Sequence, residues 1–306
     1  MSAPVFSRLA AQTAPLDNSL TPLEIAELLR NPTHQHLPFA IAPLLRVSPP
    51  TRYLREELNQ DVRLYSAHRG ARTLIVGFGG ASHRLMKPIS HFLQMMPDDF
   101  YDVLVITDAQ RRHHDAGIQG YSNSLLETLI RIKALSDTRS YRRLITYGTS
   151  MGGFPALRAG LWLGADRAVS IGGAFCSHPP RLLRGSDEVR AFDLLCHCRP
   201  GGYVPLVTAF STGHSLDVER HAALRAVLPD CIELKINSDR HNVIHHLDRR
   251  GELPAFYATI FGENDVSASP NWRPAKSKAL QARRHPRSVW QRLFRRCRAF
   301  FRLDVA

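Results

Sequence analysis

Apolar runs of strand length recur along this chain, separated by stretches with helical spacing. The runs are rich in β-branched residues, and several are apolar at four or five consecutive positions, as a strand covered on both faces must be. They lie at 73–77, 101–107, 143–147, 168–171, 204–210 and 231–236. Because strands alternate with helices, the sequence predicts an α/β fold with a mostly parallel central sheet and helices on both of its faces.

Two helices are predicted in the middle of the chain. The first gathers leucine and isoleucine on one face of 125–132, and Ser122 or Asn123 is positioned to cap its N-terminus. The second runs over 154–163 and ends near Gly164, because glycine is favoured where a helix terminates.

The remaining elements are predicted from shorter signals. A third helix follows Asp217 and stops at Pro229, since proline cannot continue a helix. Near the N-terminus, 22–29 predicts a helix with proline at its first position and Thr21 as its N-cap. Residues 62–65 predict an early antiparallel strand.

The length of 306 residues and a hydrophobic content of 44% suit one large core better than two small ones. We expect an N-terminal segment over 1–60, partly helical and packed on the core, and a core over 61–262. Within that core, 174–202 contains no predicted strand, and its position in the order of elements predicts a small cap over the site. Residues 263–306 are expected to form a basic linker and a tail helix.

One serine lies where a predicted strand gives way to a predicted helix. Ser150 has Gly148 two residues before it and Gly152 two residues after it. A serine hydroxyl is a weak nucleophile, so it needs a base, an orienting acid and a sharp turn that lifts its oxygen clear of the backbone. In such a turn, side chains at the two glycine positions would collide with the neighbouring strand and helix. The pattern therefore favours a nucleophilic serine over a glycine-rich turn with an incidental one.

Over about residues 61–262 the chain resembles the α/β-hydrolase family, whose nucleophilic serine sits on such a turn. In that family the acid and then the base follow the serine, on loops after later strands. The resemblance implies that Asp217, which follows the run at 204–210, is the acid, and that His241, which follows the run at 231–236, is the base.

The acid and the base each have alternatives in the sequence. Asp217 could instead cap the helix that follows it, a common role for aspartate, and Asp193 is the reserve acid. His245 and His246 compete with His241, although they lie one turn deeper in the next helix. His241 and His245 have the spacing of a helical zinc pair, but the H-E-x-x-H pattern is not met.

The oxyanion of an acyl-transfer intermediate requires two converging backbone amides. One is the amide just after the nucleophile, here Met151. The resemblance implies that the other comes from the glycine-rich loop 77–81, with an amide near Gly80 as the donor. This loop has Phe-Gly-Gly in place of the His-Gly-Gly type, and it matches neither glycine-rich phosphate-binding pattern.

The net charge of +13 is concentrated at the C-terminus, because 271–306 holds eleven Lys and Arg and a single acid, Asp304. Residues 288–303 predict a helix with large aromatic residues on one half and arginines on the other. Such a helix suits an anionic membrane surface. Docking on a protein partner or on the chain's own body is the alternative. Nucleic acid is disfavoured, because it would not need four aromatic residues on one face.

The sequence predicts no cofactor and no resident metal. Cys196-His197-Cys198 has one residue between its cysteines, whereas zinc sites use two to four, and no second ligand pair lies nearby. Five cysteines are too few and odd in number for a disulfide framework. Since neither a membrane-spanning run nor a secretory signal is apparent, we expect a cytoplasmic protein, or one peripheral to the inner face of the membrane.

Together these features predict a serine hydrolase, an esterase or related acyl hydrolase that acts through an acyl-serine intermediate on a small-molecule or acylated substrate. The alternative is a non-catalytic protein of the same fold that its basic tail attaches to a membrane-associated assembly. The complete set of Ser150, Asp217 and His241 favours the enzyme.

Overall fold

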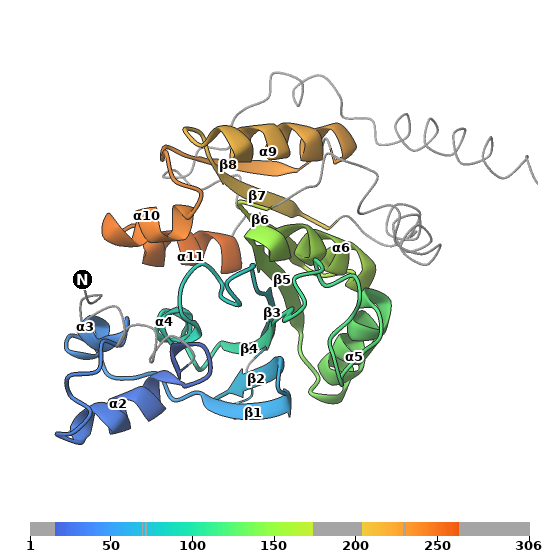
Figure 1. The fold of residues 1–306 in the computed structure, drawn as a ribbon. Helices are drawn as coiled ribbons and strands as arrows, with labels where there is room; N and C mark the ends of the chain where they lie inside the picture. Colours follow the sequence, from blue (N-terminus) through green and yellow to red (C-terminus); the bar gives the residue numbers. More distant parts are fainter. Residues whose placement is uncertain (1–15, 69, 71, 174–203, 229–230, 263–306) are drawn as a thin grey trace, which may run out of the picture.

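The computed structural model describes residues 16–68, 70, 72–173, 204–228 and 231–262. Its centre is an eight-stranded sheet with the order β1-β2-β4-β3-β5-β6-β7-β8 (Figure 1). The strands are β1 Leu54–Asn59, β2 Val62–Ser66, β3 Thr73–Phe78, β4 Tyr101–Ile106, β5 Arg143–Thr149, β6 Arg167–Ile171, β7 Leu206–Ser211 and β8 Ile232–Ile236. At one edge β2 pairs antiparallel with both β1 and β4, and the other five pairings are parallel, so the mostly parallel sheet and the early antiparallel strand are confirmed.

Helices cover both faces of this sheet, as predicted (Figure 1). They are α2 Pro22–Arg30, α3 Ala42–Leu45, α4 Ile89–Gln94, α5 Leu125–Thr138, α6 Gly153–Leu163, α9 Ser215–Val227, α10 Val243–Arg249 and α11 Leu253–Phe261. Ile75 of β3 packs with α4, α10 and α11, whereas its neighbours Leu74 and Val76 pack with α5 and α6. Alternate residues of β3 thus enter two separate cores, which is why the whole strand must be apolar.

The boundaries of the two central helices were predicted with mixed success. The end of α6 is confirmed, because Gly164 is its C-cap and has a left-handed φ of +63°. The predicted caps of α5 are wrong. Ser124 caps it, with its Oγ accepting from the amide of Glu127 at 3.1 Å, whereas Ser122 and Asn123 lie before the cap.

The predicted N-terminus of α2 is confirmed, whereas that of α9 is not. Thr21 caps α2 and forms a reciprocal capping box with Glu24, so this prediction is confirmed. α9 begins at Ser215 with His214 as its N-cap, and Asp217 lies in its first turn. Both the helix start after Asp217 and the alternative role of Asp217 as an N-cap are therefore wrong.

The first described residues pack on the edge of the sheet. α2 and α3 share a small apolar cluster that includes Ile25, Phe39 and Ile41. The Tyr65 hydroxyl and the Arg55 guanidinium, both from the antiparallel strands, donate to the carbonyl oxygen of Ser19. These contacts join the N-terminal helices to β1 and β2.

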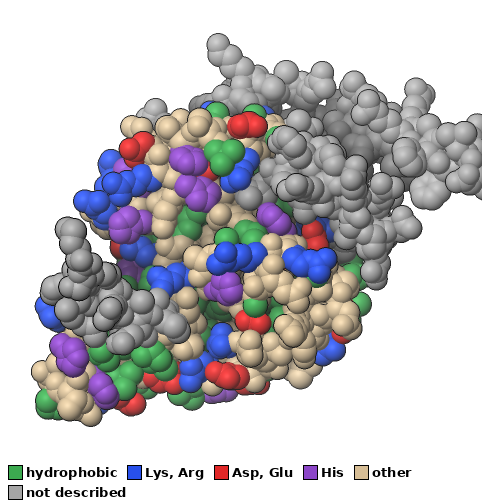
Figure 2. Space-filling model, viewed as in Figure 1, with side chains coloured by type: hydrophobic (Ala, Val, Ile, Leu, Met, Phe, Trp, Pro, Cys, Tyr) green, Lys and Arg blue, Asp and Glu red, His purple; other side chains and the backbone are tan. Residues whose placement is uncertain are grey.

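Several predictions fall on residues outside the described ranges. These are the cap at 174–202 with its reserve acid Asp193, the Cys196–Cys198 motif, and the tail at 263–306. Among the helices that the structure describes, none is long and apolar enough to cross a membrane. Figure 2 shows Lys, Arg and His side chains spread over the described part of one face, with hydrophobic side chains in small groups between them.

Candidate active site

The turn between β5 and α6 holds Ser150 in a strained conformation. Its φ of +50° lies in the left-handed region, which residues other than glycine seldom adopt. A Cβ atom at Gly148 would overlap the carbonyl oxygen of Gly152, and a Cβ atom at Gly152 would overlap the carbonyl oxygen of Phe78. Both glycines are therefore required for this turn, for the steric reason that the sequence indicated, and the serine stays half-exposed.

Ser150, His241 and Asp217 form a connected row of side chains. Oγ of Ser150 lies 2.9 Å from Nε2 of His241, and Nδ1 of His241 lies 2.7 Å from Oδ1 of Asp217. They come from the turn after β5, the loop after β8 and the first turn of α9. Because β5, β6, β7 and β8 are parallel neighbours, their carboxyl ends meet at one edge of the sheet and bring these distant residues together.

Asp217 is the buried end of this row, since its side chain has no exposed surface. Its position in the first turn of α9 favours a negative charge, because the helix dipole is positive there. His241 is about one third exposed, so the row opens toward solvent at the serine end.

The hydrogen bonds of the row indicate where its protons lie. A carboxylate can only accept, so Nδ1 of His241 carries the ring proton and donates to Asp217. Nε2 of His241 then has a free lone pair, which can accept from the Ser150 hydroxyl. This is the tautomer in which a histidine is able to remove the proton of a serine.

The competing histidines do not reach the serine. His245 and His246 lie within α10, and neither is hydrogen-bonded to Ser150. Nδ1 of His245 instead lies 3.4 Å from Nζ of Lys87. Of the three histidines considered from the sequence, the structure brings only His241 to Ser150.

The two predicted oxyanion donors have different surroundings. Met151 lies in a 3-10 turn, η1 Ser150–Gly152, that leads into α6, and amides in a first helical turn have no intrahelical acceptor. Gly80 lies close to the serine, because a Cβ built on it would be 3.4 Å from the Cβ of Ser150. Its amide, however, donates to the carbonyl oxygen of Arg84 at 2.9 Å. The prediction of Gly80 as the second donor is therefore wrong in this conformation.

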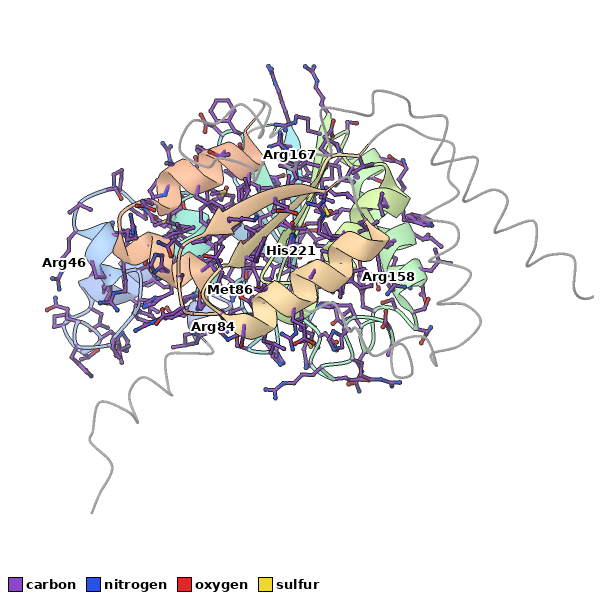
Figure 3. All side chains as sticks on the ribbon, turned by 90° about the horizontal axis from the view of Figure 1, so that it is seen from above. Arg46, Arg84, Met86, Arg158, Arg167 and His221 are labelled. Carbon is purple, nitrogen blue, oxygen red and sulfur yellow. The ribbon has the colours of Figure 1, made fainter. Side chains whose placement is uncertain are left out.

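The loop that follows β3 is fixed by contacts that sequence reasoning missed. Nδ2 of Asn242 donates to the carbonyl oxygen of Met86 at 3.1 Å, and Nε2 of His114 lies 3.2 Å from the carbonyl oxygen of Gly79. Figure 3 labels Met86 and Arg84, which this loop carries. Burial lowers the pKa of His114. A neutral His114 that donates from Nε2 holds Gly79 in place beside the serine turn.

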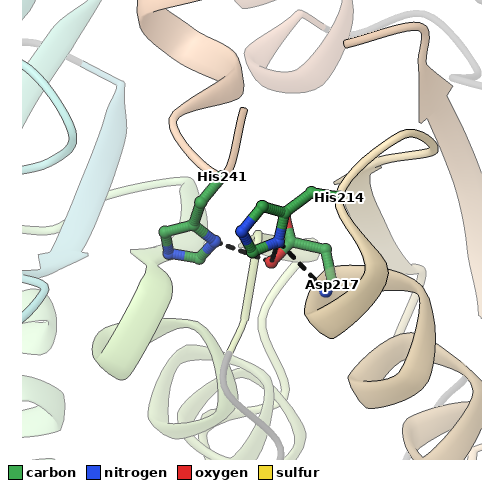
Figure 4. Close-up of side chains that lie close together, drawn as sticks. All are labelled: His214, Asp217 and His241. Carbon is green, nitrogen blue, oxygen red and sulfur yellow. Dashed lines mark hydrogen bonds and ion pairs between the residues drawn. The ribbon is translucent and has the colours of Figure 1, made fainter. Parts of the chain in front are cut away.

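His214 is a second histidine beside Asp217, and the sequence analysis did not single it out. Its Nδ1 lies 3.2 Å from Oδ1 of Asp217, and its ring centre lies 5.5 Å from that of His241 (Figure 4). The only signal in the sequence is its place three residues before Asp217, in the same loop.

No family model and no curated protein sequence matches this chain. Three solved structures that it resembles are the 2,6-dihydroxy-pseudo-oxynicotine hydrolase, the esterase of Pyrobaculum calidifontis and Est1E from Butyrivibrio proteoclasticus. Their identities are 14%, 11% and 13%, and their TM-scores are 0.45, 0.43 and 0.45. The matches cover 72%, 65% and 70% of this chain and 70%, 79% and 100% of the others. The parallel sheet, the strained serine between β5 and α6 and the chain order serine, aspartate, histidine identify this chain as an α/β-hydrolase fold protein.

Proposed function

We propose that this protein is a serine hydrolase, an esterase or related acyl hydrolase, with Ser150 as nucleophile, His241 as base and Asp217 as orienting acid. The observation that carries the proposal is the unbroken row from Ser150 through His241 to Asp217, with atom separations of 2.9 and 2.7 Å. The strained turn that presents the serine supports the same proposal.

In the first half of the reaction, Oγ of Ser150 attacks the carbonyl carbon of the acyl group while its proton passes to Nε2 of His241. The carbonyl oxygen becomes an oxyanion, and the amide of Met151 is the first donor to it. When the tetrahedral intermediate collapses, the bond to the leaving group breaks and the leaving group takes the proton from His241. The acyl group then remains on Ser150 as an ester.

In the second half, a water molecule gives a proton to His241 and its oxygen attacks the acyl carbon. The bond to Oγ breaks, Ser150 recovers its proton from His241, and the carboxylic acid leaves. The negative charge of Asp217 keeps the His241 ring in the correct tautomer and stabilises the imidazolium in both halves. A buried carboxylate at 2.7 Å is well placed for this electrostatic role.

The second oxyanion donor belongs to the loop after β3 in this proposal, although not to Gly80. Within the described residues, the amide of Ala81 donates to no other group, and Ala81 is exposed next to Gly80. It is thus an amide of this loop that could turn toward a substrate oxygen. Ala81 replaces Gly80 in the proposed machinery.

Labelling with a fluorophosphonate probe tests the proposal, because such probes react with an activated serine. We expect the full chain to be labelled and Ser150→Ala not to be labelled. Ser82→Ala is the matched control, since Ser82 is an exposed serine on the loop after β3. Labelling that does not depend on Ser150, or no labelling at all, would contradict the proposal and favour the non-catalytic alternative.

A further inference from the structure

His214, Asp217 and His241 direct two imidazole nitrogens and a carboxylate toward one another (Figure 4). One ligand-type atom from each residue lies within 4.8 Å of the other two. Oδ1 of Asp217 is 3.2 Å from Nδ1 of His214 and 2.7 Å from Nδ1 of His241. Ligand atoms around a tetrahedral zinc ion are roughly 3.3 Å apart, given metal–ligand distances of about 2.0 Å. The 3.2 Å separation is close to that spacing, and the 2.7 Å separation is a hydrogen bond that must lengthen when an ion replaces its proton.

Asp217 also has a buried oxygen that nothing in the described structure satisfies. Its Oδ2 has no hydrogen-bond partner, and the residue is only 2% exposed. A buried carboxylate oxygen without a partner is unfavourable, and a cation that the carboxylate binds through both oxygens gives Oδ2 a partner.

Nδ1 is the nitrogen of the His214 ring that lies beside the Asp217 carboxylate. The amide of Asp217 donates to this nitrogen at 3.3 Å, a long hydrogen bond that an ion bound to Nδ1 must replace. The His214 and His241 side chains are each about one third exposed, so an ion can reach the space between them.

We propose that His214, Asp217 and His241 bind a divalent transition-metal ion of the zinc type, and that the bound ion inhibits the enzyme. Two imidazoles and one carboxylate are ligands that zinc takes in proteins, with water or another small ligand completing the tetrahedron. The binding site stands on its own geometry, whereas the inhibition rests on the proposed function.

Inhibition follows from the tautomer of His241. Catalysis needs the proton on Nδ1 and the lone pair on Nε2, toward Ser150. A metal ion on Nδ1 uses the lone pair of that nitrogen, so the ring proton must lie on Nε2. Nε2 can then no longer accept the serine proton. The ion also takes the Asp217 oxygen that orients the ring, so binding and catalysis exclude each other.

Binding is measured first, with cobalt(II) and zinc(II) titrated into the metal-free full chain. Cobalt bound by Cys196 or Cys198 would be recognised by its intense thiolate absorption. We expect His214→Ala to weaken the nitrogen- and oxygen-ligated site by at least the roughly 10- to 100-fold that loss of an outer-shell partner costs. Ser150→Ala and the matched control His246→Ala should bind as the parent does. Equal binding by His214→Ala and the parent would overturn the site.

Inhibition is measured next, as the rate of fluorophosphonate labelling with and without saturating zinc. Zinc should slow labelling of the parent about tenfold or more. His214→Ala, compared with its own metal-free rate, should be little affected at the same zinc concentration. If zinc binds through His214 but labelling is unchanged, the inhibition is overturned while the site stands. If Ser150 is never labelled, the proposed function fails, and the cobalt titration still decides the site.

Discussion

Asn242 joins the loop of His241 to the loop after β3, since its Nδ2 donates to the carbonyl oxygen of Met86 at 3.1 Å. The same side chain caps α10, because its Oδ1 accepts from the amide of His245 at 2.9 Å. One side chain therefore serves the helix that follows the proposed base and the loop that borders the serine.

Asn242→Ser separates these two contributions. Serine is also a good N-cap, so α10 should keep its start and the melting temperature should change little. The shorter side chain has no amide to reach Met86, so the two loops should lose their alignment and kcat/KM should fall about tenfold or more. Asn242→Ala, which loses both contacts, should lower activity and melting temperature together. Full activity in the serine variant would mean that the bond to Met86 does not position the site.

The parts of the site that the sequence predicted are those set by local sterics. Gly148 and Gly152 are needed because of atoms within a few residues or in the adjacent strand, and that requirement is visible in the spacing alone. The apolar strands were also predicted, because a strand covered on both faces requires consecutive apolar residues, and such runs are visible in the sequence. β1 was not, because it is an edge strand of sequence LREELN, with each residue exposed or half-buried, and it has no hydrophobic pattern.

Contacts between loops were not predictable, because they depend on how separate turns face one another. The amide of Gly80 donates to the carbonyl oxygen of Arg84. In this loop His83 and Met86 adopt left-handed conformations, which their residue types do not predict. The position of His214 against Asp217 likewise depends on where α9 begins, and the helix begins at Ser215, three residues earlier than predicted.

Gly80→Ala tests how closely the loop after β3 approaches the nucleophile. The new Cβ would lie 3.0 Å from the carbonyl oxygen of Thr149 and 3.4 Å from Cβ of Ser150, so the serine turn must shift. We expect turnover to fall about 10- to 100-fold with a smaller relative loss of stability. Gly79→Ala is the matched control, because its Cβ would meet nothing closer than 3.4 Å. Steady-state kinetics and thermal melts on both variants would decide, and equal effects would mean that the loop is structural.

His91 should make stability depend on pH. Burial, together with the charge of Lys87, lowers the pKa of His91 from 6.5 to about 4, although Asp248 opposes the shift. Below about pH 6.5 the unfolded chain gains this proton and the folded chain does not, so the contribution to stability is full above pH 6.5 and is lost toward pH 4. It amounts to up to about 3 kcal/mol. Unfolding free energies of His91→Gln should vary less across this range, and parallel curves would contradict the assignment.

Removing the residues after Gly262 tests the predicted tail. α11 ends at Phe261, and the carbonyl oxygen of Gly262 accepts from Arg143 and Arg167, so a new carboxylate at this position would remain beside two guanidinium groups. We expect the shortened chain to fold and to keep its Ser150-dependent activity. Its affinity for vesicles with anionic lipids should fall, because the basic segment is gone. Equal vesicle binding by both forms would remove the membrane hypothesis.

Single substitutions test the proposed catalytic residues. Ser150→Ala, His241→Ala and Asp217→Asn should each reduce kcat by about 10⁴-fold or more, with the aspartate variant the mildest. His245→Ala and His246→Ala are controls, because neither ring reaches the serine in the structure. Loss of turnover in one of these controls together with normal turnover in His241→Ala would show that the base is misassigned.

The combined variants test whether the three residues act as one unit. Ser150 gives its proton only to His241, and His241 holds the required tautomer only through Asp217. Once any one of the three is lost, the other two therefore no longer contribute to proton transfer. The double variant of Ser150→Ala and His241→Ala should therefore be about as active as either single variant, and the effects should not multiply. Melting temperatures should change little, because Asp217→Asn keeps the shape of the side chain and the other two residues are half-exposed. An active Asp217→Asn beside an inactive Asp193→Asn would instead assign the acid to the segment at 174–202. If the loss of activity in the double variant equalled the product of the two single losses, the histidine and the serine would act independently.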